Sequence, residues 1–260
     1  MLAPMSALRF IERPSPNFDA RTRPVDLVVL HYTGMQDADA ALRRLTDPEP
    51  IAGKYPGPWQ DPALDPTTPL GRVSAHYVVD EAGAIYRLVS EEERAWHAGR
   101  SSWDGDENVN AHSIGIEIVN GGHDFGLPPF PEPQIDAVIA LVRDILARRS
   151  LHPSRVVGHS DIAPGRKLDP GEMFPWKRLA HEGVSIWPEY VAMQASSAPD
   201  AALIQRQLQA FGYGVGETGA LDDATKHALI SFQRRFRPGR IDGIADDETQ
   251  MLLTAMTRGV

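Results

Sequence analysis

An unbroken apolar run limits the folds that this 260-residue chain can adopt. Residues 25–32, VDLVVLHY, are of strand length and lie between a proline and a nearby glycine. A strand that is apolar on both faces has to be covered on both faces, which is typical of a sheet packed between helices. The strand period of two places His31 on the face of Leu27 and Val29, at the carboxyl end of the strand. In α/β sheets this end usually holds the ligand site.

The remainder of the first 184 residues alternates strand and helix patterns. Further strands are expected from short apolar or β-branched runs bounded by turn residues: 74–80, 84–89, 113–120 and 155–157. Helices are expected from capping residues and from apolar positions at helical spacing: 37–45, 132–149 and 174–181. Residues 47–72 are rich in Pro, Gly and Asp, and we expect a long loop that rims a groove. The pattern predicts an α/β domain with a mixed central β-sheet flanked by helices.

A second domain is expected after a change in composition. Residues 185–199 lose periodicity and gain Ser, Ala and Pro, so we interpret them as a linker between a domain of residues 1–184 and one of residues 200–260. Apolar positions at helical spacing predict three short helices in the second domain: 203–211, a helix to 236 that begins at Asp222 or Asp223, and 247–256. Together these helices can form a small all-α domain around one core.

Composition excludes several classes of function. The chain has no cysteine, so disulfides, thiolate metal sites and a cysteine nucleophile are excluded, and any metal has to be held by His and carboxylate side chains. The net charge is −9 and no run of Lys or Arg exceeds a pair, so nucleic acid is not expected as a partner. A neutral glycan or a zwitterionic peptide suits this charge better. We expect no membrane span and no signal peptide in the sequence as given, although a leader could have been removed.

The densest group of reactive side chains lies in residues 156–171, VVGHSDIAPGRKLDPG. A short β-branched strand leads to His159, and the prolines and glycines that follow are expected to exclude regular helix or strand. Taken with His31, His159 and Asp169 offer two imidazoles and one carboxylate, which leaves the fourth zinc position free for water, as in catalytic zinc sites. The alternatives are a core histidine at position 31 and a surface salt bridge between Lys167 and Asp169.

A carboxylate inside an isoleucine-rich strand, Glu117, carries a desolvation cost unless it is paired. Gly115 leaves space on the same face of that strand. A buried carboxylate near metal-bound water suits a general base, whereas the alternative is an ion pair with an arginine. Lys167 could stabilise an oxyanion on the attacked carbonyl, or be a solvated loop lysine. His97, beside Trp96, is better placed to line a groove than to bind metal.

Four blocks of sequence carry a resemblance to a known family: 28–33, 95–99, 113–117 and 158–171. In this order, over about residues 24–176, they resemble the AmpD/AmiD-type zinc amidases, which are N-acetylmuramoyl-L-alanine amidases related in fold to peptidoglycan recognition proteins. The resemblance implies the following roles: zinc ligands His31, His159 and Asp169, catalytic carboxylate Glu117 with Lys167 as its electrostatic partner, and Trp96 and His97 in the substrate groove. Some phage relatives carry a tyrosine where this chain has Ala75, so Glu117 is expected to act as the base.

Residues 203–253 resemble the peptidoglycan-binding helical module, through blocks that include 204–208, 211–213, 219–222 and 242–243. The two resemblances imply a zinc enzyme, with one Zn²⁺ per chain, that hydrolyses the amide between the lactyl group of N-acetylmuramic acid and L-alanine in cell-wall turnover or recycling. The substrate would be peptidoglycan or a muropeptide, either intact wall, released fragments or the 1,6-anhydro form. The second domain would hold the enzyme on its polymer by avidity.

Two other functions remain as alternatives. One is a non-catalytic peptidoglycan receptor on the same fold, although such proteins commonly lack a zinc ligand and this chain has all three. The other is a structural zinc domain, which should have four protein ligands. The wall-binding module favours a location in the periplasm or cell envelope, whereas the absence of a leader in the sequence as given favours the cytoplasm.

Overall fold

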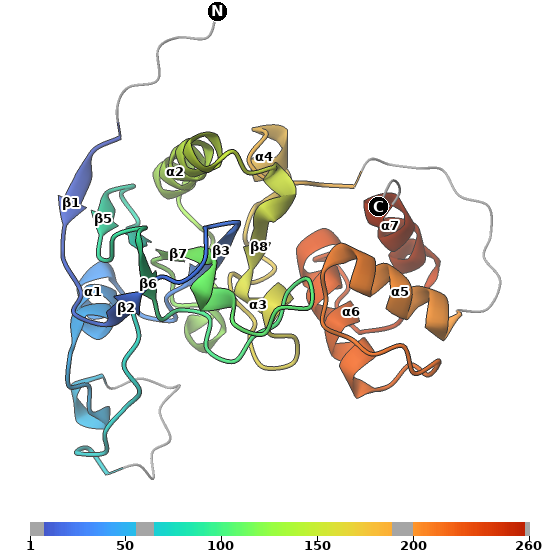
Figure 1. Cartoon of the computed structure of the whole chain (residues 1–260), viewed down its shortest axis with the longest axis horizontal. Coiled ribbons are helices and arrows are strands. Elements are labelled where there is room, and N and C mark those ends of the chain that lie inside the picture. Colours follow the sequence, from blue (N-terminus) through green and yellow to red (C-terminus); the bar gives the residue numbers. More distant parts are fainter. Residues whose placement is uncertain (1–7, 56–64, 189–199, 258–260) are drawn as a thin grey trace, which may run out of the picture.

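A six-stranded mixed sheet forms the centre of the first unit, in the order β1–β5–β4–β7–β3–β8 (Figure 1). The computed structural model describes residues 8–55, 65–188 and 200–257. The strands of this sheet are β1 (Phe10–Glu12), β3 (Leu27–Tyr32), β4 (Tyr77–Val79), β5 (Ile85–Arg87), β7 (Ser113–Ile118) and β8 (Val156–Gly158). Strand β3 pairs in parallel with both β7 and β8, so the carboxyl ends of these three strands meet at one edge of the sheet.

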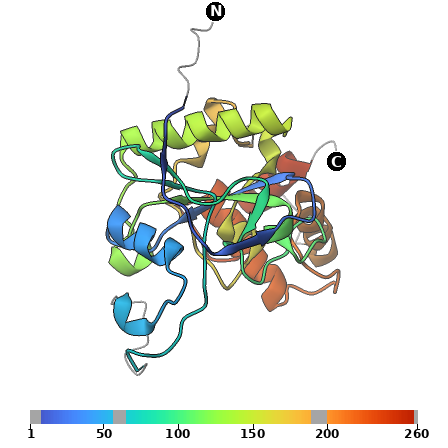
Figure 2. The same ribbon diagram turned by 60° about the vertical axis from the view of Figure 1, so that its left-hand side comes forward.

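Helices cover both faces of this sheet, as the apolar run in β3 requires. Helix α2 (Glu132–Arg149) crosses one face, where Ile135, Val138 and Val142 pack against the isoleucines of β7 (Figure 2). Helix α1 (Ala38–Thr46) covers part of the other face and begins at Asp37, whose side chain accepts the Ala40 N–H at 2.8 Å. Two short helices complete the unit: α3 (His159–Ile162) and α4 (Trp176–His181). The predicted α/β class with a mixed, helix-flanked sheet is confirmed.

The second unit consists of three helices: α5 (Ala201–Phe211), α6 (Asp223–Phe236) and α7 (Asp247–Thr257). Asp222 caps α6, since its carboxylate accepts the Thr225 N–H at 2.9 Å. These helices close around Leu208, Leu229, Phe232 and other apolar side chains, so the predicted all-α domain is confirmed.

The two units share one hydrophobic cluster. Leu27, Val29 and Val157, on the sheet face opposite α2, belong to the same apolar cluster as the core of the second unit. Trp103 of the first unit packs edge-on against Tyr213 of the second, with ring centroids 5.4 Å apart. Most of the predicted linker, residues 189–199, lies outside the described residues, but Trp187 just before it packs on Phe236.

Some local predictions were incomplete. Three strands of three residues each, β1, β2 (Phe18–Ala20) and β6 (Glu93–Ala95), had no apolar pattern and were not predicted. The predicted loop over residues 47–72 contains a 3₁₀ helix, Ala52–Lys54, and a β-bridge, while its residues 56–64 lie outside the described part of the chain. Within the described ranges, no helix is long and apolar enough to cross a membrane.

The prediction that prolines and glycines exclude regular structure after β8 was wrong at its start. His159 begins the four-residue helix α3, and the Ala163 N–H donates to the His159 carbonyl at 3.0 Å. The turn forms because Asp161 folds back and accepts the Gly158 N–H at 2.8 Å, which satisfies a donor at the helix start. The prolines and glycines end the helix only after this turn.

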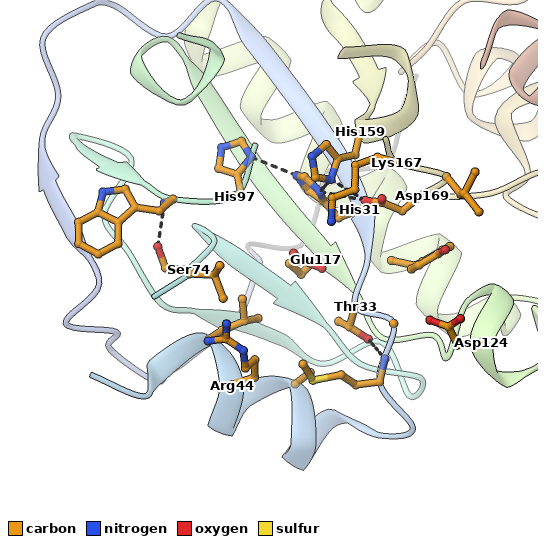
Figure 3. Close-up of a pocket in the computed structure, with 18 of the residues that line it drawn as sticks. His31, Thr33, Arg44, Ser74, His97, Glu117, Asp124, His159, Lys167 and Asp169 are labelled. Carbon is orange, nitrogen blue, oxygen red and sulfur yellow. Dashed lines mark hydrogen bonds and ion pairs between the residues drawn. The ribbon is translucent and has the colours of Figure 1, made fainter. Parts of the chain in front are cut away.

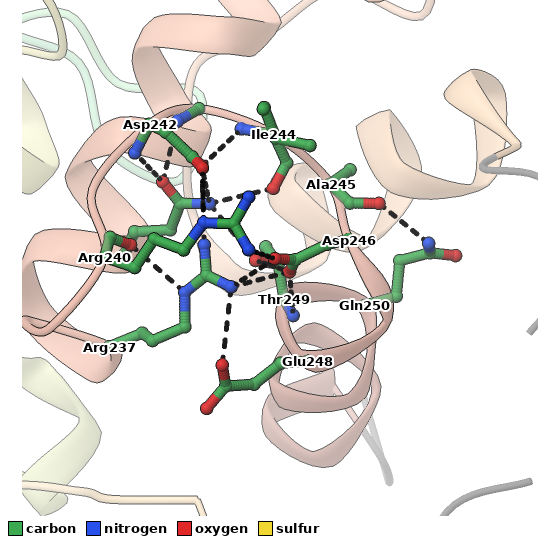
Figure 4. Close-up of polar contacts among 11 residues, drawn as sticks. Arg237, Arg240, Asp242, Ile244, Ala245, Asp246, Glu248, Thr249 and Gln250 are labelled. Carbon is green, nitrogen blue, oxygen red and sulfur yellow. Dashed lines mark hydrogen bonds and ion pairs between the residues drawn. The ribbon is translucent and has the colours of Figure 1, made fainter. Parts of the chain in front are cut away.

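A buried arginine organises the connection between α6 and α7 (Figure 4). The Arg237 side chain is 5% exposed, and its Nη1 donates to both oxygens of Asp246 at 2.6 Å. Its Nε donates to the Arg240 carbonyl at 3.1 Å. Asp246 in turn accepts the Thr249 N–H at 3.0 Å and so caps α7. The Arg237 guanidinium therefore links the end of α6 to the start of α7, while Gln233 bonds the Asp242 and Gly243 N–H groups of the same connection.

We expect Arg237→Met to lower the free energy of unfolding by about 1–3 kcal/mol, because it leaves the Asp246 carboxylate without its main donor. The control is Arg240→Met, whose side chain is 58% exposed and whose ion pairs should contribute less than about 1 kcal/mol. Urea unfolding of the full chain measures both variants. Equal midpoints for Arg237→Met and the wild type would contradict this assignment.

Candidate metal centre

The site lies at the edge of the sheet where the carboxyl ends of β3, β7 and β8 meet (Figure 3). His31 near the end of β3 is 1% exposed, and it is the register partner of Glu117 on β7. His159 follows β8 directly, and the loop after α3 returns Asp169 to the same place. The parallel register therefore brings together four residues that lie far apart in the sequence.

Three potential ligand atoms converge at nearly equal distances. The Nδ1 atoms of His31 and His159 are 2.9 Å apart. Oδ2 of Asp169 lies 3.1 Å from the first and 3.0 Å from the second. All three side chains are buried. Atoms in such a triangle require either protons between them or a cation at their centre.

Hydrogen bonds on the far side of His31 determine which of its nitrogens carries the proton. The Ser113 hydroxyl donates to the Val109 carbonyl at 2.7 Å, so its oxygen accepts from Nε2 of His97 at 3.2 Å. Nδ1 of His97 is then an acceptor, and it receives the Nε2–H of His31 at 3.1 Å. In the neutral ring this leaves Nδ1 of His31 as a bare lone pair facing the other two ligand atoms.

His159 is oriented in the same way. Its Nε2 donates to the Ala98 carbonyl at 3.1 Å, so in the neutral form that binds a metal ion its Nδ1 is also a bare lone pair. With ionised Asp169, three lone pairs then face one another with no proton to share. Such an arrangement is stable only when a cation occupies the centre, and two imidazoles with one carboxylate suit a transition-metal dication.

Protonation states agree with this chemistry. The pKa of His31 is lowered to about 4, mainly by burial and also by the neighbouring His159. Burial alone would raise the pKa of Asp169, but the two histidines outweigh it and hold that pKa well below its usual range. Both groups are therefore in the form that binds a metal ion, a neutral imidazole and an ionised carboxylate.

Glu117 lies in the same pocket but outside the triangle. Its Oε2 is shielded from solvent and has no hydrogen-bond partner among the described residues, so the arginine ion pair considered from the sequence is not formed there. The pKa of Glu117 is raised to about 8, mainly by burial and also by the charge of Asp169, while the charge of Lys167 acts in the opposite direction. An unpaired carboxylate with this pKa can exchange a proton near neutral pH.

The groove beside the triangle has a volume of about 410 Å³, and Trp96, His97, Glu117 and Lys167 all line it. The Arg72 guanidinium lies over the Trp96 ring at 5.2 Å. Lys167 has no ion-pair partner within the described ranges, and Oδ2 of Asp169 faces the two histidines, so the surface salt bridge considered from the sequence is not formed there.

His97 has a role that the sequence analysis missed. It lines the groove, but it also receives the hydrogen bond that orients His31. The space that Gly115 leaves on the face of β7 is filled by the His97 ring, which a Cβ at position 115 would overlap. The signal was therefore present in the sequence as a glycine in the middle of a buried strand.

The fold and the site together define a class: an α/β protein with two histidines and one carboxylate arranged to hold a metal ion in a groove, beside a carboxylate that has no ion-pair partner among the described residues. Residues 21–172 match the family model described as N-acetylmuramoyl-L-alanine amidase, and residues 197–253 match that of a peptidoglycan binding domain. The chain belongs to the N-acetylmuramoyl-L-alanine amidase family, as the sequence motifs predicted.

Relatives match over both units. The N-acetylmuramoyl-L-alanine amidase AmiD of Escherichia coli is 36% identical over 251 residues, which cover 89% of this chain and 82% of that protein. A solved complex of AmiD with anhydro-N-acetylmuramic acid-L-Ala-D-γ-Glu-L-Lys has a TM-score of 0.73 at 34% identity, covering 92% of this chain and 91% of that one. AmpDh3 of Pseudomonas aeruginosa, in complex with anhydromuramic pentapeptide, has a TM-score of 0.72 at 32% identity. The match covers 98% of this chain and 96% of that one.

Because the metal-free protein holds a proton on Glu117 up to a pH of about 8, while the unfolded chain releases it near 4.5, this group should destabilise the fold as pH rises through that window. Glu117→Gln cannot ionise, so it removes this dependence of fold stability on pH. We expect this variant, with chelator present, to melt at a higher temperature than the wild type at pH 8, by about 2–4 °C for each kcal/mol recovered, and by less at pH 5. A difference in melting temperature that is the same at both pH values would contradict the raised pKa.

Replacing His97 by Phe keeps a ring in the space above Gly115 but removes the acceptor for His31. We expect affinity for Zn²⁺ to fall by about 10–100-fold, because His31 is then free to take the wrong tautomer. The control is His181→Phe at the exposed end of α4. Competition with a chromogenic chelator measures the affinity, and circular dichroism checks the fold. Wild-type affinity in folded His97→Phe would show that this hydrogen bond has no effect on the metal.

Proposed function

We propose that this chain is a zinc-dependent amidase that cleaves the bond between the lactyl group of N-acetylmuramic acid and L-alanine in muropeptides or peptidoglycan. The observation that carries the proposal is the triangle of bare lone pairs on His31, His159 and Asp169, which opens onto a groove beside Glu117. The ligands in the related structures, an anhydromuramyl tripeptide and pentapeptide, support a muropeptide substrate.

The two histidines and Asp169 would hold one Zn²⁺ and leave a coordination position toward the groove. When bound, zinc supplies a water whose pKa is lowered to about 7 and a positive charge that polarises the substrate carbonyl. His97 and the Ala98 carbonyl keep the two imidazoles in the tautomers that this requires. Three protein ligands also favour a catalytic over a structural zinc.

Glu117 would move the proton during the reaction. Its Oε2 accepts the proton of the attacking water and later delivers one to the amine of L-alanine as the amide bond breaks. The absence of a partner for this oxygen among the described residues supports the role, because a carboxylate committed to an ion pair would be a weaker base. Lys167 faces the same groove and would place its ammonium near the oxygen that becomes negative.

The helical unit would bind the polymer, as its family match supports. Wall binding in turn supports action in the cell envelope, with release of stem peptides during wall turnover or recycling. The alternative of a receptor without activity is less well supported, because receptors on this fold commonly lack a ligand, whereas the three ligand atoms of this chain converge within about 3 Å of one another.

The test is mass spectrometry of purified muropeptides after incubation with the wild type, with Glu117→Ala and with chelator-treated protein. We expect the wild type to release free stem peptide, chelator to abolish release, Zn²⁺ to restore it, and Glu117→Ala to lower the rate by about 10²–10⁴-fold. Glu81→Ala, in the exposed turn between β4 and β5, is the matched control. Intact muropeptides with wild-type protein that still sediments with cell wall would favour the receptor instead.

A further inference from the structure

Residues 159–171, which carry the candidate ligands His159 and Asp169, are called the metal loop, and a carboxylate in this loop is held by side chains from the second unit. Asp161 in α3, two residues after His159, is 1% exposed. Besides the Gly158 N–H, its carboxylate accepts the hydroxyl of Tyr213 at 2.7 Å and Nη1 of Arg235 at 2.9 Å. Tyr213 and Arg235 both belong to the second unit. The turn that presents His159 is therefore completed by side chains from outside the domain that carries the metal ligands.

Arg235 of the second unit is buried against several elements of the first unit. Its side chain is 2% exposed, and Nη2 donates to the Val156 carbonyl of β8 at 2.9 Å and to the Ser185 hydroxyl at 3.3 Å. Its guanidinium also lies over the Trp176 ring of α4, 4.2 Å from the centroid. One cation from α6 thus joins the strand before His159, the helix that contains it and the helix after the loop.

Helix α6 follows the metal loop along its length (Figure 1). Arg235 binds Asp161 near the start of the loop, and Arg234 donates to Glu172 at 3.3 Å just after its end. In between, a Cβ at Gly165 would come within 2.6 Å of Nδ1 of His227. Positions 227, 234 and 235 are seven and eight residues apart, so one face of α6 makes all three contacts.

The turn cannot hold itself in place. Helix α3 has only four residues, and a single helical turn is unstable alone because its nucleation is unfavourable. Its position also affects the second ligand, because the Ser160 N–H donates to the Asp169 carbonyl at 2.8 Å. Displacement of α3 would therefore move His159 and Asp169 relative to His31.

We propose that the peptidoglycan-binding unit is also a positioning element of the metal centre: Arg235 and Tyr213, acting through Asp161, hold His159 and Asp169 in the arrangement that binds the metal ion. This inference rests on the metal site of the proposed function. It differs from a tethering role, because it requires the second unit for metal affinity and turnover even on a small soluble substrate.

The test uses the full chain with Tyr213→Phe and Arg235→Met. Tyr213→Phe keeps the ring packed against Trp103 and loses only the hydroxyl. Its matched control is Tyr86→Phe, which also removes a tyrosine-to-aspartate hydrogen bond, to Asp80 at 3.1 Å, but far from the metal loop. Arg240→Met is the exposed control for Arg235→Met. Each protein is assayed for Zn²⁺ affinity by chelator competition, and for kcat and KM on a soluble muropeptide.

We expect both test variants to bind Zn²⁺ about 10-fold more weakly, with kcat reduced at limiting zinc, restored by excess zinc, and KM unchanged. The controls should match the wild type. If Arg235→Met does not fold, Tyr213→Phe decides the question. Wild-type zinc affinity in a folded test variant, even one with a lower melting temperature, would overturn the positioning role. Absence of zinc binding by the wild type would instead overturn the proposed function.

Discussion

The convergence of three lone pairs at the carboxyl edge of the sheet is the constraint on which the rest of this structure depends. Neutral His31 and His159 and ionised Asp169 repel one another without a cation, so the fold has to impose their approach. It does so with backbone pairing, since β3 lies between β7 and β8 in parallel register. His31 and Glu117 lie near the carboxyl ends of β3 and β7, and His159 follows β8 directly. Burial of the sheet by α2 on one face and by helical packing on the other makes this register rigid.

Hydrogen bonds to the far nitrogens of His31 and His159 hold the two imidazoles in the orientation that this convergence requires. The hydrogen bonds that run from His31 as donor to His97, and from His97 as donor to Ser113, fix one tautomer, and the Ala98 carbonyl fixes another. His97 and Ala98 belong to one short segment, which therefore orients both imidazoles and also lines the groove. A change in this segment would alter metal binding and substrate binding together, so the two effects can be separated only by measuring metal affinity directly.

The sequence was sufficient for the features that depend on local patterns and motifs. The apolar run of β3, the helical spacing of α2 and the aspartate caps of α1 and α6 each predicted an element correctly, and the motif blocks identified the family. Features that depend on distant partners were missed. The Asp161 side chain of helix α3 contacts Arg235, 74 residues away, and the role of His97 depends on its ring filling the space above Gly115. Short strands such as β6, ERA, have no pattern of their own because their pairing is decided by tertiary contacts.

The contact between Asp161 and Arg235 contributes more to geometry than to stability. A buried ion pair gains little over a well-packed apolar pair, because desolvation offsets the Coulomb attraction, but breaking it leaves an uncompensated buried charge. Its bonds to β8, α3 and Ser185 favour one orientation of α6 on the first unit. A module joined by a linker alone would raise the local concentration of substrate without regard to direction. If the second unit binds the polymer as proposed, one fixed orientation would keep its binding surface at a constant distance from the groove, and only stem peptides within reach of the metal site would be cleaved.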